Sequence, residues 1–559
     1  MKKILVITLI FSLVLFLPFR SGAQDQPEKS PVTQEQFSKL ASIAAIMWWA
    51  ICFALIFFMQ SGFLLLEAGS VRAKNAANVA TKVMVHIGIA VITFYSIGFA
   101  IKSFGWPWCF ILKWKGKILS DSTIWVGTLA EVPGDYITGF SGWLNNAYSY
   151  MPWSFNPAPD VYIWAFFGSL LFCITSMAIP GTVFSERFSF KGYILFAFIY
   201  SGIIYPVFGW LIWGGLAGSP ILDPNSSLLR LVDRFFTPSV ESELGKKLLG
   251  YGMSADGSSK HFYAPYTDYA GSTGVHSLGG LIGLMGALYI GPRIGKFKKD
   301  GGAVAIPSHN VPMAVFGALL LAFCWFGFNG GSVIANYFNN SLYGKGAGSR
   351  GLYLADYIYS DLWWVIVVTV MAGGGGILGS LLSSLKLSGK ADPLIIANGL
   401  LGALVGVCSG VGFVHPFFGF IIGFVCGFQF PYSLRFVERT LRIDDAIGTI
   451  PCHAVSGIIG SIMAGIWGQG FWWGIIPIRW VHPGGEMIGG SFIPTFPIQL
   501  IGVLILFLWA LPAGYLTFLL IDKVTGCRVS AETEEMGLDI SEHGLEAYPR
   551  SPEGSSVSF

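Results

Sequence analysis

Eleven long stretches of mostly apolar residues divide this chain, and they limit the folds that it can adopt. A helix needs ~20 such residues to cross a lipid bilayer. The stretches lie near residues 45–67, 77–101, 160–184, 191–217, 268–292, 312–337, 355–385, 393–413, 416–437, 447–469 and 494–521. We therefore predict an all-α polytopic membrane protein, with eleven transmembrane helices in a domain that extends from residue 24 to residue 521.

The composition excludes most other classes of protein. Hydrophobic residues make up 53% of the 559 residues and charged residues only 12%, about half of the ~25% that is usual in soluble domains. Soluble enzyme classes are therefore largely excluded. The 34 basic and 31 acidic residues give a net charge of +3, so no basic excess indicates a nucleic-acid partner. The abundant glycine and aromatic residues suit closely packed helices surrounded by membrane lipid.

Residues 1–23 are predicted to be a signal peptide. Lys2 and Lys3 precede the apolar run Ile4–Leu17, and the small residues before and at Ala23 offer a cleavage site. The alternative is an additional first transmembrane helix, but the apolar run is short for a span.

The cysteines give no support for a disulfide or a cofactor. Only Cys109 of the eight cysteines falls in a predicted external loop, so no disulfide is expected outside the membrane. The chain has no Cys-x-x-Cys pair, and we therefore expect neither a zinc nor a redox site.

Basic residues indicate how the helices are oriented. Every loop that follows an odd-numbered stretch is basic, whereas the even-numbered loops are richer in Trp, Pro, Gly and Ser. We therefore predict a bacterial inner-membrane protein with its N-terminus outside and its C-terminus inside. Three predicted outside segments are long, near residues 103–158, 219–266 and 470–493. Residues 522–559 are expected to form a charged cytoplasmic tail.

A repeated motif places one histidine in the fifth stretch and one in the tenth. The pattern D-x2-G-x4-H-x3-G-x2-G occurs twice, 177 residues apart, with His276 in the first copy and His453 in the second. Five helices separate the copies, so the two copies run in opposite directions, as in the inverted repeats of many transporters. We predict a 5+5 inverted repeat followed by an eleventh helix. Each histidine then lies ~12 Å inward from its face of the membrane, and the two rings are expected to meet near the midplane.

Paired neutral imidazoles have a defined chemistry. Because each ring has one donor and one acceptor nitrogen, two rings can share one hydrogen bond and leave one donor and one acceptor free. Such a pair suits a small polar solute or a proton relay, whereas the alternative is two structural histidines bonded to the backbone. Asp268 and Asp445 begin the two copies and are expected to cap their helices. Asp268 could also shape an outer vestibule for a cation.

These residues belong to a set of motifs that resembles the ammonium transporter (Amt/Mep/Rh) family from about residue 45 to residue 548. The motifs are Glu67 to Asn75, Trp213-Gly214-Gly215, Asp268 to Gly271 with His276, His309 to Met313, Trp325 to Ser332, Asp444-Asp445 with His453, and Gly537 to Tyr548. The resemblance implies a homotrimer with one narrow pore per subunit, ammonium or ammonia as the substrate, and a cytoplasmic face at which a PII-type signalling protein can dock.

The resemblance also implies roles for single residues. Trp213 and Ser332 would form an outer ammonium site, since an indole face attracts a cation and a hydroxyl accepts from N–H. The alternative for Trp213 is an interfacial anchor. Phe328 matches one of two stacked gate phenylalanines, and Phe172 is the expected second one. Trp325 is assigned to the same substrate path, which leads to the His276–His453 pair.

Four features depart from the family pattern. Gly168 stands where another Phe is usual, with Phe166 and Phe167 nearby. Gly448 replaces an acidic residue, and Cys408 stands where Thr is expected. Finally, 55 residues separate Trp213 from Asp268, where family members have a shorter link, and residues 219–266 read as an inserted outside loop.

The leading hypothesis is ammonium uptake in which the ion loses its proton before crossing. A bare cation at the bilayer midplane costs several kcal/mol, and potassium cannot avoid that cost by deprotonation. The transport is electrogenic if the proton follows along the histidines and electroneutral if it does not. The alternatives are an ammonium sensor that signals through the tail with little flux, and a membrane enzyme with histidine-bound haem or metal. For the tail, the alternatives are a packed regulatory arm and a solvated acidic segment.

Overall fold

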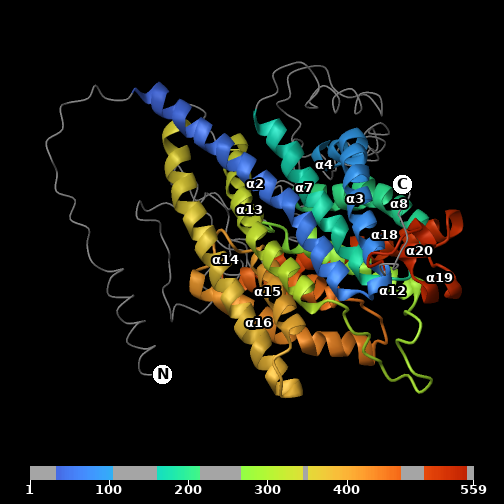
Figure 1. Ribbon diagram of the computed structural model, residues 1–559. Coiled ribbons are helices and arrows are strands. Elements are labelled where there is room, and N and C mark those ends of the chain that lie inside the picture. Colours follow the sequence, from blue (N-terminus) through green and yellow to red (C-terminus); the bar gives the residue numbers. More distant parts are fainter. Residues whose placement is uncertain (1–32, 105–159, 214–265, 344–349, 468–495, 550–559) are drawn as a thin grey trace, which may run out of the picture.

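The computed structural model describes residues 33–104, 160–213, 266–343, 350–467 and 496–549 (Figure 1). The predicted signal peptide lies outside the described residues, as do nearly all of the three long outside segments. The predictions for these segments therefore stay predictions.

The described chain is a bundle of helices. Its membrane helices are α2 (Gln34–Ser70), α3 (Ala76–Thr93), α4 (Phe99–Phe104), α7 (Asp160–Val183), α8 (Phe190–Ile199), α9 (Tyr205–Trp213), α12 (Leu278–Ile290), α13 (Val311–Tyr343), α14 (Arg350–Ser388), α15 (Pro393–Val407), α16 (Pro416–Arg435), α17 (Ser456–Trp467) and α18 (Phe496–Val524). Two short helices follow in the tail, α19 (Ala531–Met536) and α20 (Leu538–His543). The all-helical membrane class is thus confirmed.

The eighth predicted span is a shorter helix than the sequence indicated. Ten helices in the described part of the chain are long and apolar enough to cross a membrane, and Pro393–Val407 is a shorter apolar helix. This helix, α15, begins with Asp392, whose carboxylate accepts from the N–H groups of Leu394 and Ile395. It ends six residues before the predicted limit, because the chain turns from Cys408 onward until His415 caps α16.

Five of the described spans contain a π-helical turn, and one of these turns, Phe436–Thr440, continues α16. Residues 94–98 join α3 to α4, and residues 200–204 join α8 to α9. Residues 272–277 and 450–455 precede α12 and α17, and they contain His276 and His453. A π-turn inserts one residue into a helix and turns the side chains around it, which is common at functional sites.

Small residues allow the two copies of the repeat to cross closely. A Cβ at Gly280 of the first copy would lie 2.6 Å from the backbone nitrogen of Ala454, and a Cβ at Gly457 of the second would lie 2.3 Å from the carbonyl of Ser272. Each copy therefore packs its glycine against the other copy. A side chain at either position would separate the helices that carry the histidines.

The same symmetry extends to the third and eighth helices. Tyr269 N–H donates to the carbonyl of Ser409, beyond α15, and Ala446 N–H donates to the carbonyl of Val183, at the end of α7. Tyr269 and Ala446 are 177 residues apart, which is the spacing of the repeat. These paired contacts fit the inverted architecture predicted from the sequence.

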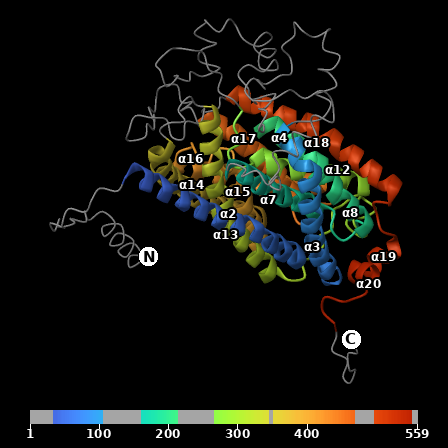
Figure 2. The ribbon, with the colours of Figure 1, turned by 90° about the horizontal axis from the view of Figure 1, so that it is seen from above.

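The remaining helices enclose this centre. The long helices α2, α13 and α14 lie together on one side of the bundle, α18 lies along its edge beside α12 and α17, and α19 and α20 lie near the ends of α3 and α8 (Figures 1 and 2). We call the side of the bundle that holds Arg72, Arg187 and Arg293 the basic face. The side that holds Trp213 and Asp268 is the opposite face.

Gly460→Ala is expected to destabilise the bundle by about 1 to 3 kcal/mol, as overpacking of a close contact does. A Cβ at Gly460 would lie 1.8 Å from the carbonyl oxygen of Gly406 on α15, so one of the two helices must move. Gly88→Ala is the matched control, because a Cβ at Gly88 meets nothing within 4 Å. Thermal unfolding in detergent measures both variants. Equal melting temperatures for the two variants would contradict this packing.

Candidate functional site

Two buried histidines meet in the centre of the bundle. The Nδ1 atoms of His276 and His453 lie 3.3 Å apart, and the two rings are close to parallel. One ring must donate and the other must accept in this hydrogen bond, so the rings hold opposite tautomers. Nε2 of His276 is buried and has no hydrogen-bond partner among the described residues. The pair therefore presents an open polar atom inside an apolar bundle.

The sequence pattern explains how each histidine reaches this place. Gly271 and Gly448 both have left-handed backbone, with φ of +94° and +83°, a conformation that glycine adopts without strain. The chain turns sharply there, and the π-helical turn with the histidine begins directly afterwards. The Asp and Gly of each copy thus fix where the helix starts.

Asp268 is fully engaged by its own chain. Its Oδ2 accepts from the N–H groups of Thr273 and Gly274, at 3.0 and 2.7 Å, and from the hydroxyl of Thr273 at 2.7 Å. Its Oδ1 accepts from the Ser409 hydroxyl at 2.7 Å. With four donors on two oxygens, the carboxylate caps the first turn and binds the segment after α15 to it.

Asp445 plays the equivalent part at the start of the tenth helix. Its oxygens accept from the N–H groups of Gly448, Thr449 and Ile450, at 3.1, 3.0 and 2.6 Å. Gly448, which departs from the family pattern, provides one of these N–H groups. Burial raises the pKa of the Asp445 carboxyl to about 6, although the N–H groups of Ile450 and Thr449 act to lower it.

Aromatic rings cover the histidine pair toward the opposite face. Phe172 and Phe328 stack with ring centroids 4.3 Å apart at 15°. Below them, the Trp325 ring lies 5.1 Å from the His276 ring, and Phe328 lies 5.4 Å from it. The structure therefore brings together these three aromatic rings and His276, which the sequence had assigned to one path.

Trp213 lies next to this stack. Its ring centroid is 6.1 Å from that of Phe172, and its Nε1–H donates to the carbonyl of Asp268 at 2.7 Å. The indole also lies against Gly274, where a Cβ would come within 2.5 Å of it. These contacts hold the indole beside the stacked phenylalanine pair. Ser332 is buried one helical turn beyond Phe328, to whose carbonyl its hydroxyl donates at 3.1 Å.

The phenylalanines near Gly168 do not join the stack of Phe172 and Phe328. Phe166 is buried against Phe99, with ring centroids 5.3 Å apart, and Phe167 lies 6.1 Å from Phe53. In the part of the chain that the structure describes, the rings over His276 come from Phe172, Phe328 and Trp325. The missing Phe at position 168 is thus not replaced by a shift of its neighbours.

Phe63 also lies near the histidine pair, a position that the sequence did not indicate. Its ring lies 6.4 Å from that of His453 and is 2% exposed. No pattern distinguishes it from the other 45 phenylalanines, because its role depends on how α2 packs. In the described ranges, no group of three or more His, Cys, Asp or Glu residues is arranged to hold a metal ion.

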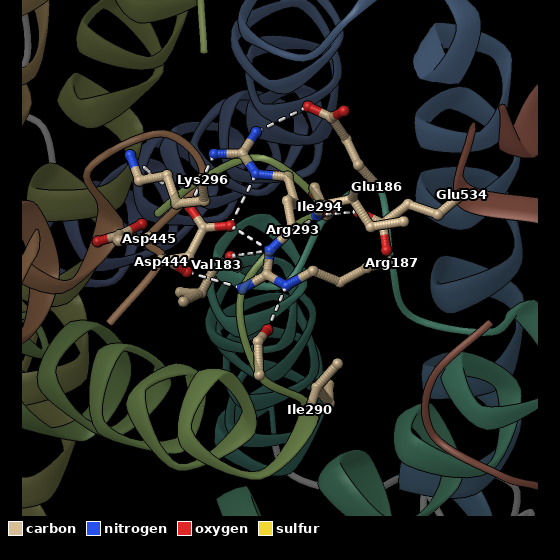
Figure 3. Close-up of polar contacts among 12 residues, drawn as sticks. Val183, Glu186, Arg187, Ile290, Arg293, Ile294, Lys296, Asp444, Asp445 and Glu534 are labelled. Atoms are coloured by element: carbon tan, nitrogen blue, oxygen red, sulfur yellow. Dashed lines mark hydrogen bonds and ion pairs between the residues drawn. The ribbon is translucent and has the colours of Figure 1, made fainter. Parts of the chain in front are cut away.

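The basic face contains a buried network of charges (Figure 3). Arg293 donates through Nε and Nη2 to the two oxygens of Asp444, both at 2.9 Å, and through Nη1 to Glu186 at 2.8 Å. Arg187 donates to the Asp444 carbonyl at 2.7 Å. Burial acts to raise the pKa of the Asp444 carboxyl, but the hydrogen bonds from Arg293 and the charge of Arg187 hold it well below its usual range.

The tail packs against the same face. The Asp539 carboxylate accepts from the N–H groups of Ala77 and Asn78, at 3.1 and 2.7 Å, in the first turn of α3. Leu538 N–H donates to the side-chain oxygen of Asn75 at 2.9 Å, and Asn75 Nδ2 donates to Glu186 at 2.9 Å. The tail is therefore a packed arm up to residue 549 and is connected to the charge network.

Comparisons with known proteins agree on one family. The sequence model of the Ammonium Transporter Family matches residues 47–548. Ammonium transporter Amt2 of Archaeoglobus fulgidus is 31% identical over 505 residues, which are 90% of this chain and 88% of that protein. Ammonium transporter 1 member 3 of Solanum lycopersicum is 30% identical over 90% of this chain and 93% of its own length.

Solved structures give the same result. The structure named Sensor Amt Protein is 26% identical with a TM-score of 0.63, over 90% of this chain and 99% of that chain. Candida albicans Mep2, at 20% identity and a TM-score of 0.57 over 88% and 87% of the two chains, shares the fold.

Asp444→Asn is expected to destabilise the protein by about 3 kcal/mol or more, as the loss of one partner from a buried ion pair does. The variant removes the charge that Asp444 shares with Arg187 and Arg293, and Arg293 keeps the Glu186 carboxylate. Asp300→Asn is the matched control, since the exposed Asp300 carboxylate accepts from the Gly302 N–H at 2.8 Å, a bond that an amide oxygen keeps. Thermal unfolding in detergent at pH 7 compares them, and a smaller loss for Asp444→Asn than for the control would refute the role of the network.

Asp445 gives a prediction of pH dependence. Folding raises the pKa of this carboxyl to about 6 from an ordinary 3.8, so its contribution favours the folded state at low pH and is lost as the pH rises through about 6. Between pH 5 and pH 7 the wild type should lose about 1 kcal/mol relative to Asp445→Asn. Unfolding of both proteins across this range measures the difference. A constant difference would show that Asp445 does not titrate in this window.

Proposed function

The chain belongs to the ammonium transporter family, and from that premise we propose that it conducts ammonia, released from ammonium, past the His276–His453 pair. Ammonium transport itself is the activity of the family to which the chain is assigned. The observation that carries the mechanism is the contact of 3.3 Å between the two imidazoles, which lies beneath the stacked rings of Phe172 and Phe328.

The first step is recruitment of ammonium at the opposite face. The Trp213 indole, whose N–H is held by the Asp268 carbonyl, offers its ring face to a cation. Ser332 adds a hydroxyl that accepts from N–H of the ion. Because the four hydrogen bonds on Asp268 come from the chain, we assign Asp268 to the shape of this entrance and not to direct binding.

The second step is the loss of the proton. The phenylalanine pair replaces the hydration shell with apolar surface, so the charged form becomes costly and neutral ammonia is favoured. Beyond the rings, the buried Nε2 of His276 has no hydrogen-bond partner among the described residues. It can form one hydrogen bond with ammonia. Potassium has no neutral form and meets the full cost of the apolar path.

The proposal includes an orientation in the membrane and an assembly. We propose that the opposite face is external, that the basic face is cytoplasmic, and that residues 1–23 are a signal peptide of a bacterial inner-membrane protein. We also propose a homotrimer, with one pore in each subunit. The docked tail, through Asp539 and Leu538, is a regulatory arm, and a PII-type protein is the candidate partner at the cytoplasmic face.

A sensor is the second candidate function. It is favoured by the likeness to the structure named Sensor Amt Protein and by the contact between the tail and the charge network. A sensor would bind ammonium with little flux. Uptake of isotope-labelled ammonium into vesicles, at saturating ammonium, separates the two functions, because binding without uptake supports the sensor.

His276→Ala is expected to lower ammonium uptake about tenfold, since one hydrogen bond to passing ammonia is lost. His415→Asn is the matched control: His415 caps α16 outside the path, and Asn keeps a capping oxygen. Uptake of labelled ammonium by cells that lack their own transporters measures both variants at equal protein levels. Uptake by His276→Ala at the rate of the control would contradict conduction along the histidines.

A further inference from the structure

A buried thiol holds the tryptophan that lies against His276. Cys408 is the first residue beyond α15 and is fully buried. The Nε1–H of Trp325 donates to its Sγ at 3.2 Å. Sulfur is a weak acceptor, and an indole N–H has no other way to be satisfied than to donate. The one polar atom of the Trp325 side chain is therefore hydrogen-bonded to Cys408.

The thiol continues a row of hydrogen bonds across three helical segments. Its Sγ lies 3.3 Å from Asn329 Oδ1 on α13 and 3.1 Å from the carbonyl oxygen of Leu404 on α15. Either oxygen can accept the single thiol proton. Asn329 Nδ2 then donates to the Thr369 hydroxyl on α14 at 3.0 Å. The orientation of the Trp325 ring therefore depends on the positions of α14 and α15 as well as on its own side-chain rotamer.

The backbone of the same residue reaches the repeat. The carbonyl of Cys408 accepts from Ala270 N–H at 2.9 Å, one residue before the left-handed Gly271 that begins the turn with His276. Cys408 is therefore connected to both members of the stacked pair: its thiol contacts Trp325, and its carbonyl binds Ala270, at the start of the segment that carries His276.

We infer that Cys408 is a positioning residue of the conduction path, which holds the Trp325 indole flat against His276 and keeps its N–H out of the pore. The consequence for transport rests on the proposed function. With the N–H bound to sulfur, Trp325 presents an apolar face 5.1 Å from the His276 ring, and ammonia can bind Nε2 of His276 without competition from the indole. A freed indole N–H would add a second binding atom, which would hold ammonia or water and slow its passage.

Transport by three variants tests this role. Cys408→Ala should lower the maximal uptake of ammonium about fivefold to tenfold, because the indole loses its acceptor. Cys408→Ser should restore most of the rate, since a hydroxyl also accepts from N–H. Cys426→Ala is the matched control: its thiol is buried too, but it donates to the Ser456 carbonyl. Uptake by Cys408→Ala equal to that of Cys426→Ala would overturn the inference.

A spectroscopic measurement tests the contact without transport. The S–H stretching band of Cys408 is isolated as the infrared difference between the wild type and Cys408→Ser. Trp325→Phe keeps an aromatic ring but removes the N–H, so this band should shift, whereas it should stay in place in His415→Asn. A band that does not respond to Trp325→Phe would refute the contact. If the wild type takes up no ammonium but the band responds, the proposed transport fails and the positioning of Trp325 stands.

Discussion

Two helices that begin inside the bundle from opposite faces are the constraint on which the site depends. A helix start leaves N–H groups without partners, and such groups cannot remain unpaired in an apolar interior. Here each start is closed by a carboxylate of its own copy, Asp268 or Asp445. The left-handed glycine that follows turns the chain, and the π-helical turn then runs into the bundle. The contact between His276 and His453 is a consequence of these two capped starts.

The surroundings of the pair explain how one path can favour a neutral solute. In the proposed mechanism, the stacked rings of Phe172 and Phe328 exclude a hydrated ion, and Trp213 lies beside them. Trp325 covers His276 with an apolar face, while its N–H is bound to Cys408. In the proposed mechanism, ammonia therefore forms hydrogen bonds with the imidazoles and not with the Trp325 N–H.

A network of paired charges lies at the basic face of the described bundle. Asp444, Arg293 and Glu186 satisfy one another at the basic face, and the tail residues Asp539 and Leu538 contact the same region. This arrangement connects the tail to the start of the tenth helix through Asn75 and Glu186. In the proposed regulation, these contacts connect the tail to the helix start that precedes His453.

The sequence predicted the helical class and the meeting of the two histidines, because the spacing from Asp to His in each copy follows directly from helix geometry. The resemblance to the ammonium transporter family, and not helix geometry, assigned Phe172 as the ring that stacks on Phe328. The early end of α15 was not predicted, since apolar residues continue to Val414 and only packing turns the chain at Cys408. The charge network was missed for a similar reason: Glu186 and Arg293 come from loops 107 residues apart.

The central claim is that ammonium gives up its proton before it passes the histidine pair. Its most direct test is charge displacement in vesicles that contain the purified protein, after a rapid jump in ammonium concentration, with potassium as the comparison ion and a pH-sensitive dye inside. The account predicts a saturable response to ammonium, as a current or as an internal pH change, and none to potassium. An equal response to potassium would contradict it, because potassium has no proton to lose.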